Sequence, residues 1–179
     1  INQVLKDNEA EIETVRNYDF RQIIRNMQNI ENSDYESPKD LKTELRPYQK
    51  FGYQWLRTLA DLGFGGILAD DMGIGKTLQV ITLLEDEKLH DPQAISLVVC
   101  PSSLILNWQS EIAKFSDALT SILITGNMEE RKALIYKAKD YDVVITSYDY
   151  LKRDIEHYEN FHFTYQIIDE AQYIKNHNT

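Results

Sequence analysis

Short apolar runs alternate with longer amphipathic stretches over the last two thirds of the chain. The runs at 66–70, 96–100, 121–125, 141–146 and 165–169 are rich in Val, Ile and Leu, and they predict five strands. The stretches between them, such as 77–89, have helical character. This alternation is typical of a parallel α/β sheet flanked by helices, with binding residues at the carboxyl ends of the strands. Five units in about 135 residues are too few for a closed barrel, so we expect an open wound sheet.

The stretch after Pro101 predicts a further helix, for which Ser102 is a suitable N-cap. Its apolar residues recur at helical spacing and predict a buried face formed mainly by Leu106, Trp108, Ile112 and Phe115. We interpret Trp108 and Trp55 as core or surface residues rather than as platforms for base stacking.

Residues 1–44 have a different pattern. Apolar side chains at helical spacing predict one amphipathic helix; they are Phe20, Ile23, Ile24, Met27 and Ile30. Residues 32–40 collect Asn, Ser, Asp, Glu and Pro, which is typical of a linker. We interpret 1–44 as a short helical preamble that packs against the main domain, 45–179, and an independent functional site in it is the alternative.

Composition narrows the class of protein. The 179 residues suffice for one domain with a proper core, and the longest apolar stretch is too short and too polar to cross a bilayer. No signal peptide is visible, and the single cysteine, Cys100, indicates a reducing compartment, so we expect a cytoplasmic protein without a membrane partner. A chain that begins at Ile1 and stops at Thr179 reads as part of something longer.

Net charge and the sequence motifs described below differ in what they indicate about nucleic-acid binding. Nineteen Lys and Arg against 29 Asp and Glu give a net charge of −10, which by itself disfavours nucleic acid as a partner. The four histidines and Cys100 lack the spacing of metal ligands, so we infer no zinc site.

The sequence DDMGIGKT at 70–77 stands between a predicted strand and a predicted helix. Gly73 and Gly75 allow close approach of the backbone to phosphates, and the following helix directs its positive N-terminus at them. Lys76 is placed to reach the β- and γ-phosphates, and the hydroxyl of Thr77 to bind Mg²⁺. Asp70 stands where the usual phosphate-loop pattern has glycine. An ordinary Gly-rich loop is the alternative.

A pair of carboxylates, Asp169 and Glu170, ends the last predicted strand. An acid at this position can hold Mg²⁺, and its neighbour can orient or deprotonate the attacking water. Taken alone, the pair could equally be a solvated helix cap. Together with a phosphate loop on the same sheet, it favours catalysis.

Five segments, in order, resemble the first RecA-like lobe of the Swi/Snf-type ATPases of helicase superfamily two. They are LRPYQKFGYQWL at 45–56, ADDMGIGKTLQ at 69–79, VCPSSL at 99–104 with Asn107 and Trp108, VITSY at 144–148, and DEAQYIKN at 169–176. The last is most similar to bacterial members. In this family the loop usually opens with Asp, so Asp70 fits, while Asp71 and Ile74 are mild departures.

The resemblance implies a P-loop fold and an ATP·Mg²⁺ site. Gln49 would read the adenine edge, Lys76 and Glu170 would be catalytic, and Thr77 and Asp169 would bind the metal. The implied nucleotide-binding residues are Arg46, Gln49, Met72, Gly73, Ile74, Gly75, Lys76, Thr77 and Leu78. The implied contacts to one DNA strand are Pro101, Ser102, Ser103, Asn107, Thr146, Ser147 and Tyr148.

By the same resemblance, the whole protein would be a DNA-dependent ATPase that moves along double-stranded DNA and remodels protein–DNA complexes, near the nucleoid if bacterial. A second RecA-like lobe would complete the nucleotide site, and we expect these 179 residues alone to turn over ATP very slowly. Three alternatives stay open: a strand-separating helicase, the motor of a restriction system, and a non-enzymatic nucleotide- or DNA-binding module.

Overall fold

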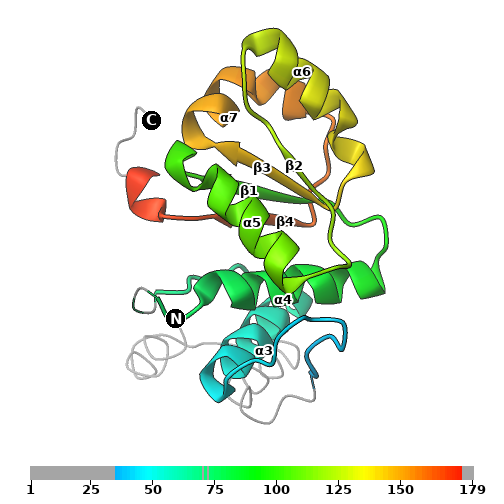
Figure 1. The fold of residues 1–179 in the computed structure, drawn as a ribbon, viewed down its shortest axis with the longest axis vertical. Helices are drawn as coiled ribbons and strands as arrows, with labels where there is room; N and C mark the ends of the chain where they lie inside the picture. Colours follow the sequence, from blue (N-terminus) through cyan, green and yellow to red (C-terminus); the bar gives the residue numbers. More distant parts are fainter. Residues whose placement is uncertain (1–34, 70, 72, 175–179) are drawn as a thin grey trace, which may run out of the picture.

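The computed structural model describes residues 35–69, 71 and 73–174. Within them, parallel strands form one sheet in the order β2-β3-β1-β4 (Figure 1). The strands are β1 (Ser96–Cys100), β2 (Ser121–Leu123), β3 (Val143–Ser147) and β4 (Tyr165–Ile168). The predicted parallel α/β sheet is confirmed. The amphipathic helix predicted at 20–30 lies outside the described residues.

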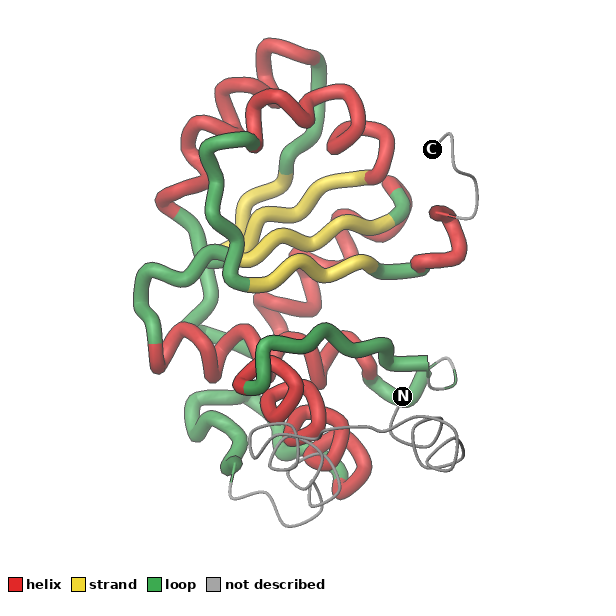
Figure 2. Tube along the Cα trace, turned by 180° about the vertical axis from the view of Figure 1, so that it is seen from behind, coloured by secondary structure: helices red, strands yellow, loops and turns green. Residues whose placement is uncertain are grey.

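Helices cover both faces of this sheet. They are α3 (Pro47–Asp61), α4 (Lys76–His90), α5 (Ile105–Phe115), α6 (Met128–Lys137) and α7 (Tyr148–Asp154). Short 3-10 turns add η2 (Ser102–Leu104), η3 (Ala138–Asp140), η4 (Ile155–Tyr158) and η5 (Ala171–Ile174). Figures 1 and 2 show α6 and α7 on one side of the sheet and α4 on the other, with α3 packed outside α4. None of the helices in these ranges is long and apolar enough to span a membrane.

The alternation of side chains along β1 divides the core in two. Val98 and Cys100 pack with Ile81 of α4 and Trp108 of α5 on one face. Leu97 and its neighbours on the other face pack with α6, η3 and η4. Because β1 and β3 are buried along their whole length, their sequences are continuous apolar runs, which is what made them recognisable.

The strand predicted at 66–70 is wrong for the described part of that run. Residues 64–69 have no regular structure, and the side chain of Ile67 is 84% exposed. The chain here follows α3: a Cβ on Gly66 would lie 2.7 Å from Leu59 and 2.8 Å from Trp55. Glycines before a run of only three apolar residues favour strand formation weakly. β4 is therefore an edge of the described sheet.

Two details predicted for the helix after Pro101 are also wrong. Ser102 begins the turn η2 and makes no side-chain cap, because α5 itself starts only at Ile105. Leu106 is 68% exposed, whereas Trp108 and Ile112 are buried as expected. Leu106 lies two residues before Trp108 in the same helix, a rotation of about 200°, which places it on the outer face.

The described end of the preamble, 35–44, packs beside α3 and α5. The hydroxyl of Tyr53 donates to the carbonyl of Glu36 at 3.2 Å, and Nε2 of Gln54 donates to that of Tyr35 at 3.0 Å. Lys42 N–H donates to the carbonyl of Phe115 at 2.9 Å. These contacts agree with a packing role for this part of the linker.

A buried ion pair joins α6 to α7. Arg131 Nε and Nη2 donate to the two carboxylate oxygens of Asp154 at 2.6 and 2.8 Å. Arg131 Nη1 donates to the carbonyl of Gly126 at 2.9 Å, and its guanidinium lies 4.6 Å from the ring centre of Tyr150. The hydrogen bonds to Asp154 raise the pKa of Arg131, although burial opposes this effect. This pair fixes α7, and with it the carboxyl end of β3.

Asp154→Asn is expected to lower the free energy of unfolding by about 3–5 kcal/mol, because it leaves the Arg131 guanidinium buried without its counter-charge. Denaturant unfolding followed by circular dichroism measures it. The matched control is Asp117→Asn, which breaks the pair with Lys42 on a carboxylate that is 80% exposed and should cost under about 1 kcal/mol. Equal losses for the two variants would contradict the structural role of the buried pair.

Candidate functional site

The Gly-rich loop leads directly into α4. Gly73 and Gly75 have φ of 82° and 83°, the left-handed region that glycine enters without steric cost. A Cβ on Gly73 would meet nothing within 4 Å, whereas one on Gly75 would lie 2.4 Å from Nε2 of Gln49. The loop is therefore open beside Gly73 and closed by α3 beside Gly75. Asp70 and Met72 lie outside the described residues.

Gln49 fastens this loop to α3. It is buried in the first turn of α3; its Nε2 donates to the carbonyl of Ile74 at 3.0 Å, and its Oε1 accepts from the N–H of Arg46 at 3.0 Å. The oxygen and the nitrogen of the amide are thus both hydrogen-bonded within the protein. If the same amide binds adenine, one or both of these bonds must be replaced by bonds to the base. The adenine role stays a prediction. Arg46 itself is exposed, with Nη1 3.4 Å from the Tyr48 hydroxyl.

The first turn of α4 presents the polar groups of the loop. Nζ of Lys76 donates to the carbonyl of Asp71 at 2.8 Å, and Thr77 is half-buried. Leu78 is buried in the core, so it can offer a ligand only its backbone N–H. The N–H groups and positive dipole at a helix N-terminus favour phosphate.

Asp169 follows β4 at the carboxyl edge of the sheet, where its N–H donates to the carbonyl of Val99 at 2.9 Å. The N-terminus of α4 and this end of β4 lie on the same side of the molecule in both views (Figures 1 and 2). Across the described ranges, no three His, Cys, Asp or Glu side chains form a group that could hold a metal ion. Mg²⁺ in nucleotide sites uses one or two carboxylates together with phosphates, and the Asp169 carboxylate and Thr77 hydroxyl fit that donor set.

Side chains from two helices meet at Asp169. The indole Nε1 of Trp108 donates to Oδ2 of Asp169 at 2.9 Å, and the N–H of Glu170 donates to Oδ1 at 2.9 Å. The hydroxyl of Tyr148, the first residue of α7, donates to the carbonyl of Asp169 at 2.5 Å. Burial and then the nearby Asp169 carboxylate raise the pKa of Tyr148, which keeps its hydroxyl protonated as a donor. Burial likewise raises the pKa of Cys100 to about 12.

Glu170 has an unusual backbone. Its φ is 52°, a left-handed value that costs a non-glycine residue about 1–3 kcal/mol and is commonest at functional sites. Nε2 of Gln172 donates to the Glu170 carboxylate, and the N–H of Tyr173 donates to the Glu170 carbonyl at 3.0 Å. Two hydrogen bonds, one to the carboxylate and one to the carbonyl, thus hold Glu170 in the turn after β4.

The residues predicted to contact DNA fall into two groups. Ser102, Ser103 and Asn107 are exposed around the start of α5, next to the half-buried Pro101. Thr146 and Ser147 are buried, and the hydroxyl of Ser147 accepts from the N–H of Tyr150 as the cap of α7. The side chains of this second group are buried, so they are not accessible to a phosphate on the surface. A DNA contact by either group stays a prediction.

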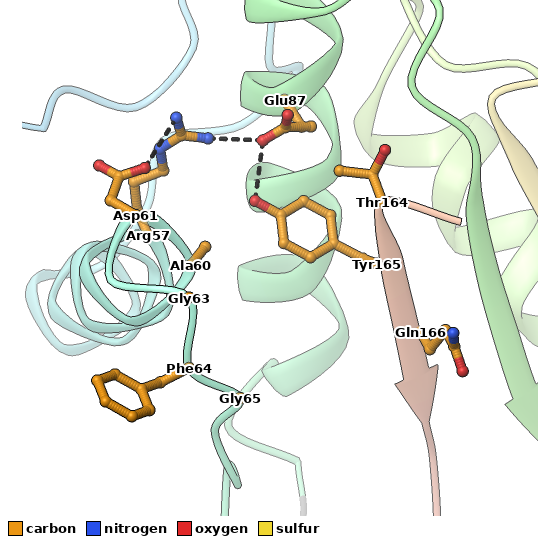
Figure 3. A pocket seen from close by; sticks show the side chains of 10 residues that line it. All are labelled: Arg57, Ala60, Asp61, Gly63, Phe64, Gly65, Glu87, Thr164, Tyr165 and Gln166. Atoms are coloured by element: carbon orange, nitrogen blue, oxygen red, sulfur yellow. Dashed lines mark hydrogen bonds and ion pairs between the residues drawn. The ribbon is translucent and has the colours of Figure 1, made fainter. Parts of the chain in front are cut away.

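A cavity of about 490 Å³ lies elsewhere, between the end of α3, α4 and the amino end of β4 (Figure 3). Arg57 donates to Glu87 at 2.7 Å and pairs with Asp61 at 3.1 Å, while the Tyr165 hydroxyl donates to Glu87 at 2.9 Å. None of the residues that line it belongs to the predicted nucleotide or DNA sets. Ligands of parallel sheets bind at the carboxyl ends of strands, so this cavity is not the nucleotide site.

Comparison with known families decides the class of the protein. The model of the SNF2-related domain matches residues 48–179. The chain belongs to this family. The expected RecA-like lobe is thereby confirmed, and the chain is an SNF2-family ATPase domain.

Relatives of this SNF2 domain come from several kingdoms. An uncharacterized ATP-dependent helicase of Mycoplasma genitalium is 43% identical over 136 residues, covering 75% of this chain and 13% of the relative. The yeast ISWI chromatin-remodeling complex ATPase is 40% identical over 156 residues, covering 83% and 14%. The solved SWI2/SNF2 ATPase core of Sulfolobus solfataricus in complex with double-stranded DNA is 41% identical with a TM-score of 0.74, covering 82% of this chain and 30% of that one.

Sequence reasoning missed what Trp108 does in this SNF2 domain. It was interpreted as a core or surface residue, and it is buried, but its indole N–H also bonds to a carboxylate 61 positions away in the chain. Tyr148 was assigned to DNA, and the structure turns its hydroxyl to Asp169. No spacing in the sequence signals a pairing across two strands of a sheet.

The two left-handed glycines make a matched pair of variants. Gly73→Ala should lower the free energy of unfolding by about 1–2 kcal/mol, the cost of a Cβ in this conformation. Gly75→Ala should cost more, because its Cβ also displaces the Gln49 amide from Ile74. Denaturant unfolding compares them, and a smaller loss for Gly75→Ala than for Gly73→Ala would disprove the contact between α3 and the loop.

Proposed function

We propose that the full-length protein containing this chain is a DNA-dependent ATPase that moves along double-stranded DNA and remodels protein–DNA complexes. The observation that carries the proposal is the pair of left-handed glycines leading into Lys76 and Thr77 at the start of α4, on the same side of the molecule as the end of β4, which Asp169 and Glu170 follow. The dsDNA in the Sulfolobus structure supports the choice of nucleic acid. Since the chain spans 30% of that core and 13–14% of the other two relatives, the activity belongs to the whole protein.

Each group of the site has a physical role in this proposal. The N–H groups of the loop and of the first turn of α4 bind phosphate oxygens, and the Lys76 ammonium neutralises their charge. The Thr77 hydroxyl and Asp169 carboxylate would hold Mg²⁺, which when bound offsets negative charge on the phosphates. Glu170 orients a water molecule and accepts its proton. A second RecA-like lobe supplies the remaining cationic groups, so one lobe alone turns over ATP slowly.

The start of α5 is the part of the surface best suited to DNA phosphates. Ser102, Ser103 and Asn107 are exposed together there and can donate hydrogen bonds that position a strand without reading its bases. Such neutral donors need no basic patch, which reconciles DNA binding with the net charge of −10.

Lys76→Ala in the full-length protein is expected to weaken ATP binding about tenfold or more, because it removes the cation that pairs with the phosphates. Glu170→Gln should keep ATP binding and abolish turnover. Fluorescent nucleotide titration measures the first effect and phosphate release the second. Lys139→Ala, an exposed lysine on η3, is the control and should change neither. Near-normal turnover of Glu170→Gln would exclude Glu170 as the base.

Ser103→Asp is expected to weaken duplex binding and DNA-stimulated turnover about tenfold, since a like charge near a phosphate costs about 1 kcal/mol or more. Gln93→Glu adds the same charge just before β1, at the opposite edge of the sheet, and should have little effect. Anisotropy titrations with labelled duplex at fixed salt compare the two. Equal effects would remove α5 from the DNA surface. Release of single strands in a displacement assay would instead indicate a strand-separating helicase.

A further inference from the structure

We propose that Trp108 is a positioning residue, whose indole N–H holds the Asp169 carboxylate in the orientation that Mg²⁺ needs and links the exposed start of α5 to the nucleotide site. This inference rests on the proposed function, because it assumes that Asp169 binds the metal. Trp108 touches neither DNA nor nucleotide in the proposal; it acts only through Asp169.

The geometry leaves one oxygen of the carboxylate under the control of Trp108. Oδ1 of Asp169 accepts the N–H of the next residue, Glu170, at 2.9 Å, and this local bond fixes only one end of the group. Oδ2 accepts the indole N–H at 2.9 Å from a ring that is buried in the core. Two donors on different oxygens fix the rotation of the carboxylate. Donors of this kind, behind a metal ligand, commonly change metal affinity 10–100-fold when they are removed.

The ring of Trp108 is fixed by packing in the hydrophobic core. It packs in the cluster that contains Ile105, Ile112 and Val98. Buried indoles generally need a partner for their N–H, and a carboxylate is a stronger acceptor than a neutral oxygen. Core packing alone does not require that partner, because phenylalanine fills a similar space without an N–H. The bond to Asp169 is therefore separable from the packing by substitution.

The same helix carries the exposed residues assigned to DNA. Asn107 is the immediate neighbour of Trp108, and Ser102 and Ser103 lie in the turn that leads into α5. A phosphate bound at this turn would restrain the first turns of α5, and Trp108 lies in these turns. The helix and the indole thus form a direct connection from the DNA surface to Oδ2 of Asp169. A second donor, the Tyr148 hydroxyl, holds the backbone carbonyl of Asp169 and not its carboxylate.

The first test uses Mn²⁺ as the probe in the full-length protein, with a non-hydrolysable ATP analogue fully bound. Trp108→Phe is expected to weaken Mn²⁺ binding about tenfold, measured from the EPR signal of free Mn²⁺. Binding of the analogue without metal should be unchanged. Trp55→Phe removes an indole on α3, near Gly66, and should leave the Mn²⁺ affinity at the wild-type value.

The second test separates the hydrogen bond from the shape of the ring. Replacing Trp108 by benzothienylalanine keeps the bicyclic outline and deletes the N–H, so the fold is retained even if the phenylalanine variant is unstable. It should reproduce the tenfold loss of Mn²⁺ affinity. A double-mutant cycle with Asp169→Ala, followed by denaturant unfolding without metal or nucleotide, should show coupling of about tenfold in the folding equilibrium.

The possible results distinguish a failure of the role of Trp108 from a failure of the proposed function. Wild-type Mn²⁺ affinity in the benzothienylalanine variant, or no coupling in the cycle, would overturn the inference and leave Trp108 as a core residue. Such a result, with Lys76→Ala still weakening ATP binding, would leave the proposed function standing. If Lys76→Ala binds ATP normally, the proposed function fails independently of Trp108.

Discussion

Burial of β1 on both faces is the constraint on which the rest of the molecule depends. Its parallel pairing with β3 and β4 places Cys100 beside Ser147 and Val99 beside Ile168. Because of this register, the chain leaves the sheet at one edge after each of the three strands. The segments that follow then lie close enough for side chains of α5 and α7 to reach Asp169. The register of the sheet thus determines which side chains surround Asp169.

The pattern of apolar residues predicted those elements of the fold whose burial depends on their own sequence. β1 and β3 are buried on both sides, so their sequences are continuous apolar runs, and strands were predicted for both, at 96–100 and 141–146. The run at 66–70 resembles these strands in sequence. Gly66, however, packs against α3, and the sequence does not reveal this contact. The 3-10 turn before α5 was missed because a serine just after Pro101 is equally suited to cap an α-helix. Leu106 was assigned to the buried face although residues two positions apart on a helix point in nearly opposite directions.

The candidate site shows the same division. The turn through Gly73 and Gly75 into the start of α4 was predictable because it depends on residues adjacent in the chain, and phosphate binding by Lys76 and Thr77 stays a prediction. The bond from Trp108 to Asp169 was not, since it joins residues 61 positions apart through the packing of two strands and a helix. The burial of Thr146 was equally hidden, because one short polar side chain does not interrupt the pattern of a strand.

The bond from Lys76 to the carbonyl of Asp71 has a consequence for affinity. Without nucleotide, the ammonium already donates one of its three N–H groups to a carbonyl of its own loop. This bond restrains the long side chain before any anion arrives, so less conformational entropy is lost when a phosphate accepts from the same ammonium. The loop thus holds its own cation in place for an anion.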